Sequence, residues 1–202
     1  MRFRVPLPLL RRIAASREGA TLVEFAFVAP VLLMLIMGMF DMGHNIYTKT
    51  LLEGAVQKAA RDSSIESASA RADAIDAAVT KAVRHIAPSA ELSFNRKAYT
   101  NFSEVSQPED FTDVDKDGKC AGGEPFEDVN GNGEWDSDRG AAGFGGARDA
   151  VLYTVTIKSP RLFPIANLIG LPPTFTTEAV TVLRNQPFGD QDVPEPVVGN
   201  CP

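Results

Sequence analysis

The chain has 202 residues, of which 44% are hydrophobic and 23% are charged, and its formal net charge is -6. This length allows one folded domain of ordinary size together with appendages. The acidic balance argues against a nucleic-acid partner, because phosphate neutralisation requires clustered Lys and Arg, and the only basic cluster precedes the first apolar run.

Residues 1–19 form a basic leader, and residues 20–40 form an apolar run whose only charged residue is Glu24. As a helix, this run is roughly 30 Å long, which matches the hydrocarbon core of a bilayer. The positive-inside rule places the leader in the cytoplasm and everything after Asp41 on the opposite side, which in a Gram-negative cell is the periplasm. We therefore expect a single-pass protein of the cytoplasmic (inner) membrane.

A conventional secretory signal peptide is the alternative interpretation of this N-terminus. The apolar run is longer than a usual h-region, and its far end, MGMFDMGHN, has no A-x-A-like cleavage site. Pro30 lies inside the run and is expected to bend the helix, which transmembrane helices tolerate. A membrane anchor is therefore favoured over a removable signal.

The string EGATLVEF places Gly19 directly before the apolar run and Glu24 five residues after that glycine. It resembles the type IV prepilin processing motif, which implies that a prepilin peptidase cleaves between Gly19 and Ala20. Two interpretations of Glu24 stay open. Its carboxylate can reach the cytoplasmic interface, where a charge costs less than at the bilayer centre, or, as the resemblance implies, it pairs with the new α-amino group of Ala20 on a neighbouring subunit.

The passage RRIAASREGATLVEFAFVAPVLLMLIMGMFDMGHNIYTKTLLEGAVQKAAR resembles the N-terminal module of the TadE-like family. The later string AVTVLRNQPF resembles the family's terminal strand, although Gln186 stands where a glutamate is common. The resemblance covers roughly residues 10–65 and 150–188. It implies a minor pseudopilin that assists assembly of Flp-type pili by the Tad secretion apparatus, with the peptidase and other Tad components or pilins as partners, and it implies no catalysis.

Beyond the membrane, residues 41–108 are expected to hold helices and a first strand, and residues 150–188 the strands that complete an α+β domain. The first helix should continue to about Arg61, and a second should span Ala70–Ala87, with its apolar face formed by Ala74, Ile75, Ala78, Val79 and Val83. Strands are predicted at Glu91–Tyr99, Ala150–Lys158 and Phe175–Arg184. The connection PRLFPIANLIGLPP should be buried against the sheet, with contact to the membrane or a partner as the alternative; residues 189–202 form a Pro-rich tail.

Residues 109–149 form an acidic insert with twelve Asp and Glu against four Lys and Arg. The string DVDKDGKCAGGE matches D-x-D-x-D-G-x5-E, the spacing of a calcium loop. Its candidate ligands are Asp113, Asp115, Asp117, the carbonyl of Lys119, and Glu124. A second string, DVNGNGEWDSD, offers Asp128, Asn130, Asn132, Asp136 and Asp138, but has Arg139 at the twelfth position. The pair resembles loops of dockerins or thrombospondin type 3 repeats; the alternative is a solvated acidic loop without an ion.

The two cysteines, Cys120 and Cys201, can form one disulfide in an oxidising compartment, and two free thiols are the alternative. The only histidines, His44 and His85, fall on predicted helices far from the cysteines. We therefore expect neither an enzyme nor a small-molecule substrate. The leading hypothesis is a TadE-like minor pseudopilin, and the alternative is a membrane-tethered extracytoplasmic calcium-binding adhesion or interaction protein.

Overall fold

A computed structural model describes residues 18–64, 69–163, 166–167, 170–193 and 195–202. The chain divides into two compact units. The first comprises residues 1–45 and 161–173, and the second comprises residues 46–160 and 174–202. The α+β class expected from the sequence is confirmed.

The apolar run lies in one continuous helix, α2 (Glu18–Ser63), which contains Pro30. In the first unit, the apolar side chains of this helix are exposed, among them Phe27 and Leu35. In the second unit, Leu52 and Val56 are buried, whereas Ile46 and Tyr47 are exposed. Along its length, α2 therefore changes from a helix whose apolar side chains are exposed to one that buries a stripe of apolar side chains in a core.

The second helix, α3 (Ala72–Arg84), follows a short 3-10 turn, η1 (Ser69–Arg71). It buries Ile75, Val79 and Val83, which stand four residues apart and so lie in one row along the helix. Ala74 and Ala78, which were predicted for the apolar face, are exposed. The apolar face is narrower than expected because only this single row enters the core.

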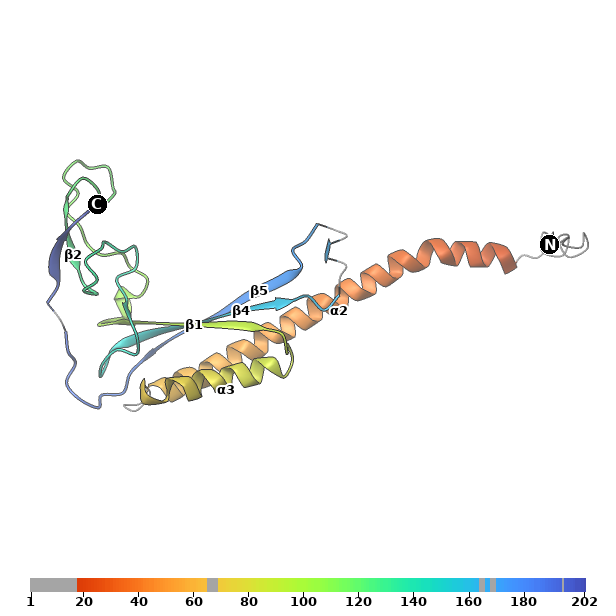
Figure 1. The fold of residues 1–202 in the computed structure, drawn as a ribbon, viewed down its shortest axis with the longest axis horizontal. Helices are drawn as coiled ribbons and strands as arrows, with labels where there is room; N and C mark the ends of the chain where they lie inside the picture. Colours follow the sequence, from red (N-terminus) through yellow and green to blue (C-terminus); the bar gives the residue numbers. More distant parts are fainter. Residues whose placement is uncertain (1–17, 65–68, 164–165, 168–169, 194) are drawn as a thin grey trace, which may run out of the picture. The chain divides into compact units, whose positions relative to one another are not determined.

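The main sheet has the order β3-β1-β4-β5, and all its neighbours are antiparallel. Figure 1 shows β1, β4 and β5 side by side. Its strands are β1 (Glu91–Tyr99), β3 (Ala141–Ala142), β4 (Ala150–Pro160) and β5 (Thr174–Arg184). Three of them agree closely with the predicted strands, and β3 was not predicted. Alternate β4 residues are buried as expected, namely Val151, Tyr153, Val155 and Ile157. This face forms the core of the second unit with α3 and the second half of α2.

An ion pair lies at the edge of this core. The guanidinium of Arg96 on β1 pairs with the carboxylate of Asp76 on α3, and the Tyr153 hydroxyl donates to Asp76 Oδ1 at 2.8 Å. The guanidinium also lies 4.2 Å from the Tyr153 ring centroid and 4.6 Å from that of Phe144. The Arg96 side chain is only 9% exposed, so its charge depends on these partners.

A second, two-stranded sheet, which we did not predict, joins the acidic insert to the last residues of the chain. Strand β2 (Pro125–Asp128) pairs antiparallel with β6 (Val197–Asn200), with Pro125 opposite Asn200. A 3-10 turn, η2 (Phe102–Glu104), precedes the insert. Within the Pro-rich tail, residues 197–200 therefore return to pair with the insert.

The apolar connection between β4 and β5 also differs from our expectation. Of its described residues, Ala166 is buried, but Leu162 and Leu171 are exposed. Its backbone folds on itself, since the Arg161 N–H donates to the Pro173 carbonyl at 3.0 Å and the Leu171 N–H to the Ala166 carbonyl at 2.9 Å. The predicted burial of this segment against the sheet is wrong for the two leucines.

Candidate functional site

The first candidate site is the apolar N-terminal half of α2. This helix is long and apolar enough to cross a membrane, with a mean hydropathy of 2.3 in its most apolar window, and none of that window is buried inside the structure. Glu24 is exposed on it. The leader up to residue 17 lies outside the described residues, while Gly19 and Ala20 lie exposed in the first turns of α2. The predicted cleavage point, between Gly19 and Ala20, therefore lies within α2.

The first acidic loop brings its three aspartates together. Carboxylate oxygens of Asp113, Asp115 and Asp117 lie within 4.8 Å of one another. Asp113 accepts the backbone N–H groups of Asp117 and Gly118 at 3.1 and 2.9 Å, and Asp115 accepts that of Asp117 at 3.1 Å. Asp117 accepts the N–H of Lys119 at 2.8 Å. The loop thus gathers three acidic side chains that could bind a metal ion.

Glu124, at the twelfth position of this loop, is buried rather than extended into solvent. Its Oε1 accepts the backbone N–H of Val114 at 2.5 Å, and its Oε2 accepts that of Ala121 at 3.5 Å. These donors offset part of the cost of burying a carboxylate. Glu124 therefore closes the first loop, in the sense that its carboxylate joins the backbone of Val114 to that of Ala121.

The second loop repeats the hydrogen bonds of the first at equivalent positions. Asp128 accepts the N–H groups of Asn132 and Gly133, four and five residues later in the chain, at 3.2 and 2.8 Å. Asp113 accepts N–H groups at the same two spacings in the first loop. Asn130 accepts the N–H of Asn132, and Asn132 that of Glu134. Asp136 joins this loop by accepting both side-chain amides, at 2.8 Å from Asn130 and 2.6 Å from Asn132.

Asp138, which we assigned to the second loop, is engaged elsewhere. Its carboxylate accepts hydrogen bonds from Lys97 Nζ and the Tyr99 hydroxyl, both at 2.8 Å. Burial alone would raise the pKa of Asp138, but these two donors hold this pKa below its usual value. Burial and the bond to Asp138 raise the pKa of Tyr99 to about 12. Asp138 therefore ties the insert to β1, and its role as a ligand stays a prediction.

Sequence reasoning missed Glu109, which takes the place of the absent twelfth residue in the second loop. Glu109 is only 1% exposed. Its Oε1 accepts the N–H of Val129 at 2.9 Å, and its Oε2 accepts that of Asp136 at 3.0 Å. Val129 is the second residue of its loop, as Val114 is of the first. Glu109 therefore closes the second loop as Glu124 closes the first.

A 15-residue repeat could have revealed this residue. The strings EDFTDVDKDG and EPFEDVNGNG begin at Glu109 and Glu124, and each glutamate stands four residues before the first aspartate of a loop. The structure pairs the two repeats reciprocally: Thr112 N–H donates to Pro125 O at 2.9 Å, and Glu127 N–H to Asp110 O at 2.8 Å. The equivalent residues Phe111 and Phe126 form an antiparallel bridge between these bonds. Each repeat thus supplies one loop and the glutamate that closes the other repeat's loop.

A disulfide joins Cys120 in the first loop to Cys201 at the end of the chain. Around it, the Cys201 N–H donates to the Glu124 carbonyl at 2.7 Å, and the Gly123 N–H donates to the Cys201 carbonyl at 3.2 Å. A cross-link over this separation reduces the entropy of the unfolded chain. The disulfide and these hydrogen bonds therefore attach the last residues of the chain to the segment that carries Glu124.

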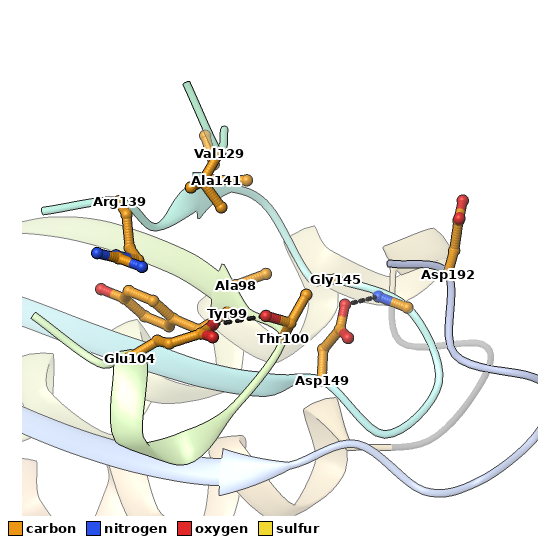
Figure 2. Close-up of a pocket in the computed structure, with 12 residues that line it drawn as sticks. Ala98, Tyr99, Thr100, Glu104, Val129, Arg139, Ala141, Gly145, Asp149 and Asp192 are labelled. Atoms are coloured by element: carbon orange, nitrogen blue, oxygen red, sulfur yellow. Dashed lines mark hydrogen bonds between the residues drawn. The ribbon is translucent and has the colours of Figure 1, made fainter. Parts of the chain in front are cut away.

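A cavity of about 280 Å³ lies beside the end of β1, where Tyr99, Glu104, Arg139 and Asp149 contribute to its lining (Figure 2). Glu104 accepts a hydrogen bond from the Thr100 hydroxyl, which holds its pKa below the usual value although burial opposes the shift. Asp149 accepts the Gly146 N–H at 2.6 Å. These carboxylates are held by structural donors, and the absence of enzymatic activity stays a prediction.

The helix and the paired loops fit a membrane-anchored protein with an α+β body and an acidic insert. Residues 19–61 match the model of a family described as TadE-like protein. This match confirms the resemblance noted for the N-terminal sequence and supports a Tad-related membrane component. Comparisons with curated proteins and with solved structures return no match.

Proposed function

We propose that the protein is a TadE-like minor pseudopilin that is anchored by residues 20–40 and helps to assemble Flp-type pili or a related Tad secretion system. The family match over residues 19–61 carries this proposal. The placement of Glu24 five residues after Gly19 supports processing by a prepilin peptidase. The leader stays in the cytoplasm, and the body lies outside the inner membrane.

Mass spectrometry of the mature N-terminus tests the processing step. We expect the purified protein to begin at Ala20 and Gly19→Leu to retain the leader. A Cβ at Gly19 meets no atom within 4 Å, so this change should affect peptidase recognition rather than the helix. Gly43→Leu is a matched control, because Gly43 is equally open on the same helix. A wild-type chain that keeps Met1, together with normal piliation after gene deletion, would favour the tethered adhesion protein instead.

We also propose that the two loops of the insert bind calcium, which is a second function and is compatible with either role. The shared hydrogen-bond pattern and the two closing glutamates favour it. Carboxylate, amide and carbonyl oxygens suit a hard cation, and calcium tolerates irregular coordination better than magnesium. Glu109 and Glu124 would complete the two ligand sets, and calcium would neutralise carboxylates that otherwise repel one another.

Calorimetric titration of the full chain in detergent tests this proposal. Extracellular calcium modules bind with dissociation constants of roughly 0.1–1 mM, so we expect heat release and a raised Tm at millimolar calcium. Glu109→Gln and Glu124→Gln should each weaken one loop and leave the other able to bind. Glu127→Gln is the control, because its side chain is exposed between the loops. The absence of any calcium-dependent heat or Tm shift would refute the metal site.

A further inference from the structure

The connection between β4 and β5 is held against the point where the apolar part of α2 ends. Arg161 Nη1 lies 2.7 Å from Asp41 Oδ2, and the Leu162 backbone N–H donates to Asp41 Oδ1 at 3.2 Å. Arg161 Nε also donates to the Pro172 carbonyl at 3.0 Å, which ties together the two ends of the connection. Helix and connection belong to one compact unit.

The ion pair is well shielded from solvent, whereas the neighbouring leucines are not. The Arg161 and Asp41 side chains are 16% and 9% exposed. Leu162 is 55% exposed and Leu171 is 46% exposed. A shielded, charge-assisted pair fixes geometry more firmly than an exposed one. The structure therefore holds two apolar side chains outward at a defined position along α2.

That position is the end of the apolar run. Asp41 directly follows Phe40, and Met39, Phe40 and Met42 are all exposed. One helical turn rises only 5.4 Å, so Leu162, whose N–H contacts Asp41, lies within about a turn of this apolar surface. The interfacial layer that accepts amphipathic segments is roughly 5–10 Å deep. Leu162 therefore continues the apolar surface of the helix at the depth of this layer.

We propose that Leu162 and Leu171, near the two ends of the connection, form a second membrane contact by entering the lipid interface of the leaflet where α2 leaves the bilayer. This inference rests on α2 spanning the membrane, and it goes beyond the proposed role in pilus assembly. Arg161 neutralises Asp41 at that depth, which reduces the cost of a carboxylate near the hydrocarbon. The contact would restrict tilting of the anchor.

Depth-dependent fluorescence quenching tests the contact on the full chain. Both cysteines are in the disulfide, so a single introduced cysteine can be labelled selectively without reductant. Leu162→Cys and Leu171→Cys would carry a small environment-sensitive fluorophore in vesicles of phosphatidylethanolamine and phosphatidylglycerol. Nitroxide-bearing lipids would report depth. Phe40→Cys is the control within the span, and Val114→Cys, at an exposed apolar residue of the insert, is the control in water.

We expect labels at 162 and 171 to be quenched several-fold more by shallow nitroxides than the label at 114. Adding Arg161→Ala should reduce quenching at 162, because the segment loses its tie to Asp41. Quenching at 162 and 171 no greater than at 114, with normal quenching at 40, overturns the second contact while leaving the anchor intact. Absence of quenching at 40 overturns the anchor, and the proposal that rests on it falls too.

Discussion

Carboxylates of the same acidic insert have different roles in this protein because their partners differ. Glu109 and Asp138 both lie in the acidic insert. Glu109 is buried against backbone N–H groups of the second loop, whereas Asp138 is held by Lys97 and Tyr99. Spacing along the chain assigned Asp138 to the loop and overlooked Glu109. The identity of a carboxylate's donors, rather than its position in a motif, decides its role.

The lowered pKa of Asp138 predicts that the folding stability depends on pH. Its pKa is lowered in the folded state, so its contribution is present above the unfolded pKa of about 3.9 and is lost as pH falls through the folded value. Asp138→Asn should destabilise the full chain by about 1 kcal/mol at pH 7 and by almost nothing near pH 2. Urea unfolding at both pH values measures this. Asp110→Asn, whose side chain is 72% exposed, should show a smaller difference at pH 7; a pH-independent effect of Asp138→Asn would contradict the assignment.

Removal of Asp76 is predicted to cause a larger loss of folding stability. Its removal leaves the Arg96 guanidinium shielded from solvent without its carboxylate, and breaking a buried pair typically costs about 3–5 kcal/mol. Asp76→Ala should therefore lower the unfolding free energy by about 3 kcal/mol, and Arg96→Met in the same chain should restore part of it. Asp73→Ala, an exposed acid on the same helix, should cost less than about 1 kcal/mol. Equal losses for Asp73→Ala and Asp76→Ala in chemical denaturation would show that the ion pair is unimportant.

At the scale of elements, hydrophobic periodicity predicted those helices and strands that a local sequence pattern can determine. Strand β1 and the alternating residues of β4 follow from period-two hydrophobicity, and α3 from its apolar row. Strands β2 and β6 could not be found in this way, because each has only four residues and they pair across the insert and the chain's end. The connection 161–173 is apolar, but hydrophobicity alone does not distinguish a buried segment from one that faces a membrane.

The disulfide predicts how the β2–β6 sheet depends on the chain's end. Strand β6 makes only a short ladder, so Cys120→Ser with Cys201→Ser should release it and cost about 2–4 kcal/mol. Hydrogen exchange should then accelerate at Gly123 and Cys201, whose amides are bonded across this junction, but not at amides between β1 and β4. Unchanged exchange at Gly123 and Cys201 would mean that backbone pairing alone holds the end of the chain.

The division into two units leads to a prediction about the whole molecule. The chain leaves the second unit after Pro160 and re-enters it at Thr174, and these residues are direct partners in the β4–β5 ladder. A short turn can therefore replace residues 161–173 without altering the register. The hydrophobic residues that α2 contributes to the core of this unit begin at Leu51. The information for folding the body should thus lie in residues 46–160 and 174–202.

We expect a chain of residues 46–160 joined to 174–202 through an Asn-Gly turn to be monomeric without detergent and to unfold cooperatively, because it keeps the core, the Asp76–Arg96 pair and the disulfide. Thermal unfolding by near-ultraviolet circular dichroism, which reports on Tyr153 packing, measures this. A matched chain that begins at residue 46 but retains 161–173 should fold equally well yet bind vesicles more strongly, because it keeps the exposed Leu162 and Leu171. Loss of cooperative unfolding only in the chain with the Asn-Gly turn would show that the connection belongs to the folding unit of the body.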